Sequence, residues 1–81
     1  MTRTFFDSNL REWEAYVTGG QPGSVHAARI FFICPDDPDA HPRYVRYAGG
    51  DAAEAQRALL EYADADLVSL LEESLPLELS A

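Results

Sequence analysis

Five side chains of the types that bind metal ions lie within eight residues of one another: Cys34, Asp36, Asp37, Asp39 and His41. Asp37-x-Asp39 has the spacing that opens a calcium-binding loop, but Pro42 and Ala48 stand where the loop needs a glycine and a distal glutamate. A zinc site needs a second Cys/His pair, which the sequence does not contain. The prolines of this stretch favour turns. We therefore predict a solvated hairpin loop and no bound metal.

Cys34 is the single thiol and the first candidate for a catalytic nucleophile. His26 lies eight residues earlier on the same predicted strand, about 26 Å away at ~3.3 Å per residue, and cannot reach it. His41 could return across the loop, but no third group is placed to orient it. A cysteine at the end of a core strand is more commonly a buried structural residue, which is our prediction here.

Other catalytic signatures are absent from the sequence. No Gly-x-Ser-x-Gly or Ser-x-x-Lys occurs, and the chain has no lysine for a Schiff base or a phosphate-binding loop. Gly19-Gly20-x-x-Gly23 precedes a predicted strand, so its amides have no helix N-terminus behind them to hold a phosphate. Glu12 and Glu14 share a strand face that is more often solvated than catalytic. We predict no catalytic or cofactor-binding residues, and no enzyme.

Arg43-Tyr44-x-Arg46-Tyr47 interleaves cations with aromatic rings, as surfaces that stack single-stranded bases do. The net charge of −8 opposes that interpretation, because residues 51–81 carry one arginine against eight acidic residues. No basic stripe suits a phosphate backbone or an anionic membrane surface. Cross-strand pairing and contacts with the acidic helices explain the same four residues. We therefore expect neither nucleic acid nor a membrane as a partner.

The 81 residues, 47% of them hydrophobic, predict a single small globular domain spanning 1–81. No apolar run approaches the ~20 residues that span a bilayer, and the first residues do not resemble a secretory signal. One cysteine cannot form an internal disulfide. Because all six basic residues are arginines, the composition is typical of a GC-rich bacterial genome. These features favour the cytoplasm.

The element order predicts an α+β domain. Strands are expected at 3–6, 11–18, 25–34 and 43–48, separated by turn-forming, Gly-rich and Pro-rich segments. Helices are expected at 52–62, where Asp51 and Glu54 form a capping box, and at 64–75, where Pro76 ends the apolar stripe. Residues 76–81 are expected to be a loose tail. Strands followed by helices favour an antiparallel sheet of about four strands with both helices on one face.

The segment 11–17 fits two patterns. Trp13, Ala15 and Val17 alternate with polar residues as in a half-buried strand. The i, i+3, i+7 spacing of Leu10, Trp13 and Val17, with Ser8 as a cap, also fits a helix. The pattern alone leaves the two structures about equally favoured.

The opening Arg3-Thr4-Phe5-Phe6-Asp7, followed by Arg11-Glu12-Trp13-Glu14, resembles the start of certain short uncharacterised bacterial proteins. In these, a Phe-x-Asp segment precedes an Arg-x-Trp-Glu strand. Their closing helix is similar too, with a Leu-x-x-Leu-Leu pattern that ends near a proline, here 67–76. The chain departs from them at Leu10, where they more often have a glycine. The resemblance implies a strand at 11–17 and no known activity.

The predicted strand 25–34 is apolar on both faces. Ala28, Ile30, Phe32 and Cys34 point one way, whereas Phe31 and Ile33 point the other. Two short helices can cover one face, so Phe31 and Ile33, together with Tyr44 or Val45, need another cover. A symmetric homodimer is the simplest solution. The alternative is that the N-terminal hairpin or the tail folds across this face.

Three functions are compatible with these features. The first is a non-catalytic protein–protein interaction module that forms a homodimer or binds a protein with a basic patch. The second is a nucleic-acid mimic that inhibits a DNA-binding protein, with Asp51, Glu54 and Glu61 standing in for phosphates. The third is a ligand-binding domain with an interface pocket, which would use Cys34, His41, Tyr44 or Arg46. We favour the first.

Overall fold

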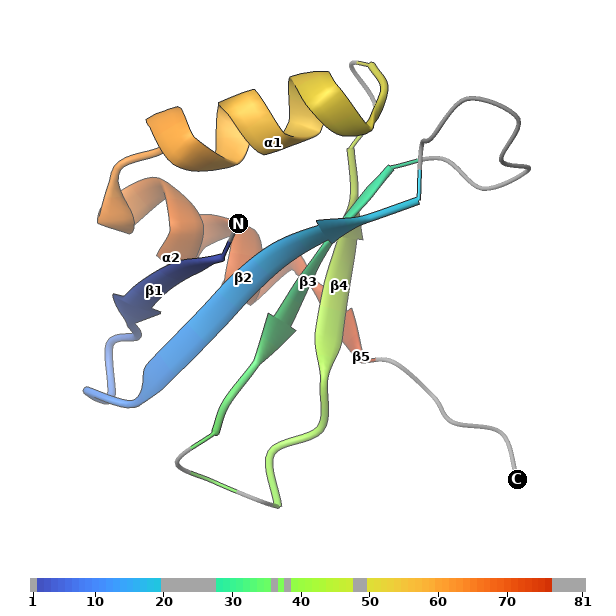
Figure 1. The fold of residues 1–81 in the computed structure, drawn as a ribbon. Coiled ribbons are helices and arrows are strands. Elements are labelled where there is room, and N and C mark those ends of the chain that lie inside the picture. The colour runs from blue at the N-terminus through green and yellow to red at the C-terminus, as the bar shows by residue number, and fades with distance from the viewer. Residues whose placement is uncertain (1, 20–27, 36, 38, 48–49, 77–81) are drawn as a thin grey trace, which may run out of the picture.

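The structure, a computed structural model, describes residues 2–19, 28–35, 37, 39–47 and 50–76. It contains a five-stranded antiparallel sheet and two helices, an α+β fold as predicted (Figure 1). The strands are β1 (Arg3–Phe6), β2 (Glu12–Thr18), β3 (Arg29–Ile33), β4 (Arg43–Arg46) and β5 (Leu75–Pro76). The helices are α1 (Ala52–Glu61) and α2 (Asp64–Glu73).

The strands lie side by side in the order β1-β2-β3-β4-β5, and each neighbouring pair is antiparallel. The register aligns Tyr16 with Phe31, Phe31 with Tyr44, and Tyr44 with Leu75. Side chains at aligned positions share one face of a sheet. These four residues therefore form one row across β2, β3, β4 and β5.

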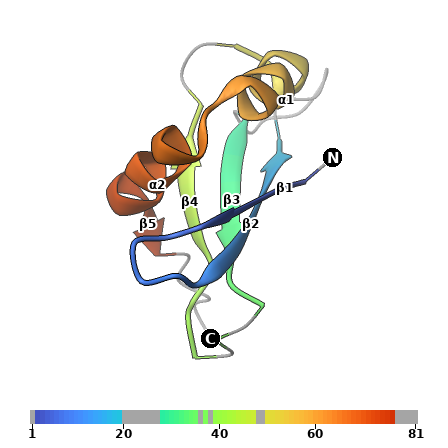
Figure 2. The same ribbon diagram turned by 90° about the vertical axis from the view of Figure 1, so that its left-hand side faces the viewer.

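Both helices pack on the opposite face of the sheet (Figures 1 and 2). Helix α1 contacts β2 and β3, and α2 contacts β1 and β4. Ala28, Ile30, Phe32 and Cys34 are buried on this face, as their alternation predicted. The core between the sheet and the helices also contains Phe5, Trp13, Ala15, Leu59, Leu67 and Leu71.

Segment 11–17 forms a strand in the structure, not a helix. Trp13 pairs with Phe5 on β1 and Ala15 with Phe32 on β3, so both neighbouring strands supply backbone partners. Trp13 and Ala15 are buried, whereas Glu12 and Glu14 are half-buried, as an alternating strand requires. The pairing partners decide between the two patterns of the segment.

Two side chains hold the N-terminal hairpin in place. The Asp7 carboxylate accepts hydrogen bonds from the backbone of Asn9 and Arg11 and from the indole N–H of Trp13. Leu10 closes the turn with a φ of 63°, a left-handed conformation that favours glycine. Arg3 donates from Nη1 to the carbonyls of Leu59, Leu60 and Tyr62 at the end of α1.

The C-terminal part differs from the prediction in two ways. Helix α2 ends at Glu73 instead of 75, and the sheet gains a fifth strand at Leu75–Pro76. Leu75, which the helical spacing placed on the apolar stripe, is 59% exposed on β5. Pro76 disfavours the helical conformation at Leu75, so the helix ends before it. Arg43 donates from Nε to Ser74 Oγ over 2.7 Å and from Nη2 to the Ser74 carbonyl. These bonds satisfy the helix end from a distant strand.

The other predicted elements are present, but β3 and β4 are shorter than expected, since Ala28, Cys34 and Tyr47 lie outside the strands, and Pro76 belongs to β5 instead of the predicted tail. The predicted helix 52–62 is α1, and the Asp51 carboxylate accepts from the Glu54 backbone N–H over 3.0 Å. Residues 25–27, 48 and 77–81 of the expected strands and tail lie outside the described residues. No described helix has the length and apolar character needed to cross a membrane.

Candidate functional site

The face of the sheet opposite α1 and α2, here called the open face, carries the candidate site. Its members follow from strand alternation, because Trp13, Ala15, Ile30 and Phe32 point toward the helices. Neither described helix lies on the open face (Figure 2). Its central side chains are those of Tyr16, Phe31, Ile33, Tyr44 and Leu75.

Three rings form a continuous aromatic row across the open face. The Tyr16 and Phe31 ring centroids are 5.6 Å apart at 47°, and those of Phe31 and Tyr44 are 6.0 Å apart at 38°. Such tilted contacts stabilise cross-strand pairs beyond the area that they bury. The described helices lie on the other face of the sheet and do not cover this row. The aromatic row is therefore an ordered apolar surface.

Charged side chains flank the aromatic row with opposite signs at its two sides. Glu12 and Glu14 lie toward one end of β2, here called the acidic end. Arg29 and Arg46, aligned across β3 and β4, lie toward the other end and form the basic end. The Arg29 guanidinium lies 5.5 Å from the Tyr44 ring centroid, a cation–π distance that ties the basic end to the row.

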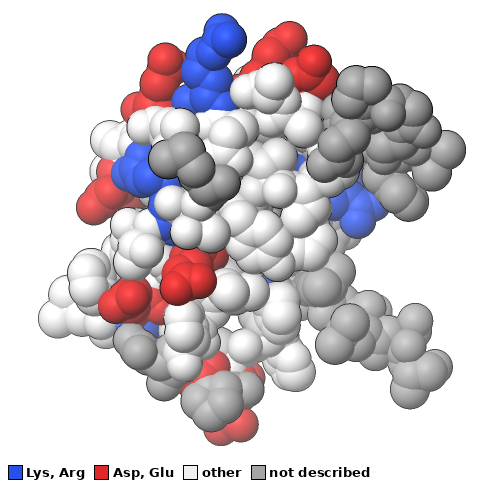
Figure 3. Space-filling view, viewed as in Figure 1, with Lys and Arg blue, Asp and Glu red and all other residues white. Residues whose placement is uncertain are grey.

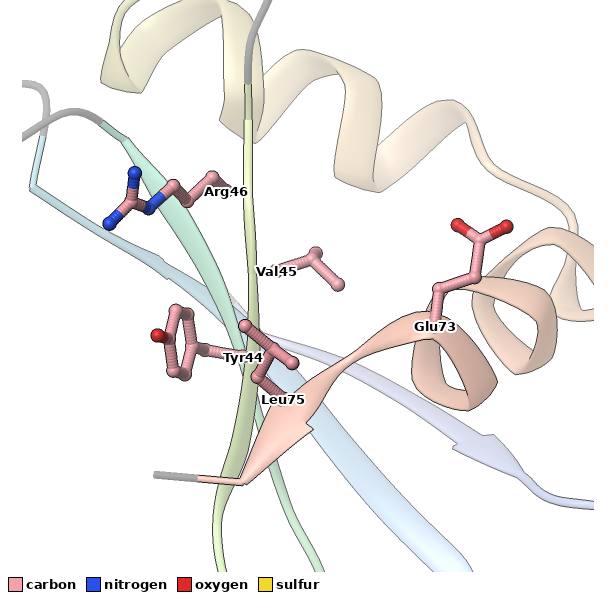
Figure 4. A pocket seen from close by; sticks show the side chains of 5 residues that line it. All are labelled: Tyr44, Val45, Arg46, Glu73 and Leu75. Atoms are coloured by element: carbon pink, nitrogen blue, oxygen red, sulfur yellow. The ribbon is translucent and has the colours of Figure 1, made fainter. Parts of the chain in front are cut away.

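Three of the four predicted interface candidates share the open face. Phe31 and Ile33 point there from β3, and Tyr44 joins them from β4. Val45 does not, because it packs against the core (Figure 4). Tyr16 also lies on the open face and was not among the predicted interface residues, although its alternation with the apolar residues of 11–17 was a usable signal. Leu75, whose position depends on β5, was not among them either.

A shallow hollow of about 320 Å³ lies at the sheet edge, between β4, β5 and the end of α2. It is lined by Tyr44, Val45, Arg46, Glu73 and Leu75 (Figure 4). Tyr44 and Arg46 point to the open-face side of β4, and Glu73 extends from α2 on the helix side. Two of these groups are charged, with opposite signs, and the hollow contains neither Cys34 nor His41. The predicted pocket residues are thus not gathered in one place.

The side chains of metal-binding type at 34–41, in the loop after β3, do not come together in the part of the loop that the structure describes. Cys34 is 7% exposed and free, whereas His41 is exposed. Asp37 pairs with Arg11 over 3.2 Å and accepts from the backbone N–H of Asp39. Asp36 lies outside the described residues. Within the described part of the chain, no group of three metal-binding side chains could hold an ion.

The Arg43-Tyr44-x-Arg46-Tyr47 motif is split between the two faces of the sheet. Arg43 points to the helix side and binds Ser74, and Tyr47 packs against the core. Tyr44 and Arg46 point to the open face. One ring and one cation of the motif therefore remain available on that face.

The acidic side chains of α1 are interrupted by a basic one. Glu54 and Glu61 line a shallow depression together with Arg57, which lies between them in sequence. Figure 3 shows acidic and basic side chains interspersed over this view, some of them side by side. A basic partner would therefore meet an interrupted acidic surface on α1.

The fold lowers the pKa of the Asp7 carboxyl at the N-terminal hairpin. Burial raises its pKa, but the hydrogen bonds from Arg11, Trp13 and Asn9 together with the Arg11 charge outweigh burial and hold the pKa below its usual value. The charged form is favoured because it accepts three hydrogen bonds at the hairpin. Asp7 therefore acts as a structural anion.

Comparison with protein-family models, with curated proteins and with solved structures finds no match to this chain. The resemblance to short bacterial proteins therefore stays a prediction. The functional argument depends on the residues of the open face alone.

Proposed function

We propose that the protein is a non-catalytic protein–protein interaction module that acts as a homodimer through its open face. The observation that carries this proposal is the aromatic row of Tyr16, Phe31 and Tyr44, which the described helices leave uncovered. Contiguous apolar surface of this kind marks interaction sites in small proteins. The single cysteine, which has no partner within the chain, is consistent with a place in the cytoplasm.

A second copy of the chain is the occupant that suits the open face best. The face is built from regular antiparallel strands, so two copies can stack as the sheets of a sandwich do, about 10 Å apart. A two-fold axis brings identical patches together, and dimers of this symmetry are the most common oligomers. The acidic and basic ends also give the face opposite charges that a second copy can match.

The size of the open face predicts a dimer of modest affinity. The five strands have 4, 7, 5, 4 and 2 residues, so at ~3.3 Å per residue and ~4.8 Å per strand the face covers on the order of 350 Å². A standard interface buries about 800 Å² on each partner. We therefore expect dissociation on dilution into the micromolar range.

The experiment is light scattering of the wild-type protein over a dilution series, compared with two matched variants. Phe31→Glu places a charge in the centre of the aromatic row, where dimerisation would have to bury it unpaired. Leu60→Glu also introduces a glutamate at an apolar position, but on α1, where Leu60 is 42% exposed and away from the open face. Circular dichroism establishes that each variant keeps its secondary structure.

We expect a mass of about 18 kDa for the wild type and for Leu60→Glu at high concentration, twice the 9.0 kDa of one chain. Phe31→Glu is expected to remain near one chain mass throughout the series. Tyr16→Glu, in the same row, is a second variant should Phe31→Glu lose its fold. A wild-type monomer at every concentration, or a folded Phe31→Glu dimer, contradicts the proposal.

A further inference from the structure

We infer that the two copies are related by a two-fold axis that lies along the aromatic row. The strands of one copy then run opposite to those of its partner across the interface. The acidic end of each copy faces the basic end of the other. This inference concerns orientation and rests on the proposed homodimer.

The geometry of face-to-face stacking limits the choice of axis. Two copies can face each other symmetrically only if the axis lies in the plane between the sheets. An axis along the strands, between β2 and β3, keeps the strand direction, so Glu14 would lie level with Glu14 of the other copy and Arg29 level with Arg29 of the other copy. An axis across the strands reverses that direction and places unlike charges opposite each other. Like charges brought to one level of a desolvated interface repel each other, which favours the second arrangement.

The register of the sheet places the charges correctly for the second arrangement. Glu14 lies two residues from Tyr16 on β2, and Arg29 lies two residues from Phe31 on β3. At ~3.3 Å per residue, each charge is about 7 Å from the aromatic row, on opposite sides of it. A two-fold rotation about the row therefore brings Glu14 of one copy to the same height along the strands as Arg29 of the other copy. The remaining offset is one strand spacing of ~4.8 Å, which long side chains span.

The charges of the open face are also available for pairing between copies. Among the described residues, the ion pairs join Arg3 to Asp64 and Arg11 to Asp37, and neither pair includes a member of the acidic or basic end. Arg29 is held over the Tyr44 ring, so its guanidinium is already placed beside the row. A guanidinium in this position loses little freedom when it meets a carboxylate.

Charge reversal tests this orientation directly. In Glu14→Arg, each of the two symmetry-related pairs consists of two arginines that face each other. In Arg29→Glu, each pair consists of two glutamates. We expect each single variant to weaken the dimer by about tenfold or more at low salt. The double variant Glu14→Arg/Arg29→Glu recreates unlike pairs and is expected to dimerise within about threefold of the wild type. Arg57→Glu and Glu61→Arg on α1 are controls with the same charge changes and no expected effect.

Mixing the wild type with the double variant separates the two possible axes. With the axis along the row, a mixed dimer places two glutamates opposite each other in one pair and two arginines opposite each other in the second pair. The two proteins then sort into homodimers. With the axis along the strands, the mixed dimer pairs unlike charges and predominates. Native mass spectrometry distinguishes the species when the wild type carries ¹⁵N, because the double variant has an identical amino-acid composition.

The outcomes distinguish this inference from the proposed function. Restoration by the double variant together with self-sorting supports the axis along the row. Predominant mixed dimers, or single reversals that leave the dimer unchanged while Phe31→Glu dissociates it, overturn the orientation and leave the proposed homodimer in place. A monomeric wild type overturns both.

Discussion

Replacing Leu10 with glycine is expected to stabilise the protein. Leu10 has a φ of 63° and its side chain is 82% exposed, so the substitution removes backbone strain and almost no packing. The left-handed conformation costs an L-residue roughly 1–2 kcal/mol. Glycine loses more freedom on folding, which offsets roughly 0.5–1 kcal/mol of that gain. The expected net increase in the free energy of unfolding is about 0.5–1 kcal/mol.

Thermal unfolding at a fixed protein concentration measures this effect. For a domain of this size, the gain corresponds to an increase in Tm of about 2–8 °C. The matched control is Leu10→Ala, which removes the exposed side chain but keeps a Cβ and therefore the strain. We expect no increase for Leu10→Ala. Equal Tm values for the glycine and alanine variants, or a lower Tm for the glycine variant, would refute the reasoning about the turn.

Two further predictions concern the hydrogen bonds that hold the N-terminal hairpin. Arg3→Ala leaves the carbonyls at the end of α1 without their donor, and we expect the free energy of unfolding, measured in urea, to fall by about 1–3 kcal/mol. Arg3→Lys is expected to recover part of this loss. An unchanged urea midpoint for Arg3→Ala would contradict the role of Arg3. Asp7→Asn lowers stability at neutral pH. The pKa of Asp7 in the folded state lies below its unfolded value of about 3.9, so the wild type loses this stabilisation as the pH falls through these two pKa values. The free energies of unfolding of the wild type and of Asp7→Asn are therefore expected to converge at low pH. A difference that does not change with pH would contradict this role of Asp7.

Local patterns in the sequence were sufficient for most of the sheet. The two-faced apolar run at β3 needed no tertiary information, because its β-branched and aromatic residues strongly favour a strand. The alternation in 11–17 was weaker, since the same residues also fit a helical stripe. The paired strands β1 and β3 decided that segment, and these pairings are not local.

The end of α2 shows both what local patterns supply and what they do not. Leu71 and Leu75 have helical spacing, but Pro76 disfavours the helical conformation at Leu75, and the Ser74 hydroxyl donates to the Leu71 carbonyl, so local features end the helix. The contact of Arg43 with Ser74, 31 residues away, and the pairing of Leu75 with Tyr44 on the open face are tertiary and could not be predicted from the local pattern.

The candidate site was predictable in part. Alternation alone assigned Phe31 and Ile33 to the face away from the core. Choosing Tyr44 over Val45 required the register between β3 and β4, because either residue could have pointed to that face. The opposite charges at the two ends also depend on register, since Glu14 and Arg29 lie on different strands.

The central claim is that two copies meet through the aromatic row, and an isotope-filtered NMR experiment tests it most directly. In an equal mixture of ¹³C-labelled and unlabelled chains, nuclear Overhauser effects between labelled and unlabelled protons arise only across the interface. We predict such effects between the rings of Tyr16, Phe31 and Tyr44. Two results would contradict the claim. One is intermolecular effects confined to β1, an edge strand of the sheet. The other is the absence of intermolecular effects at concentrations where light scattering shows a dimer.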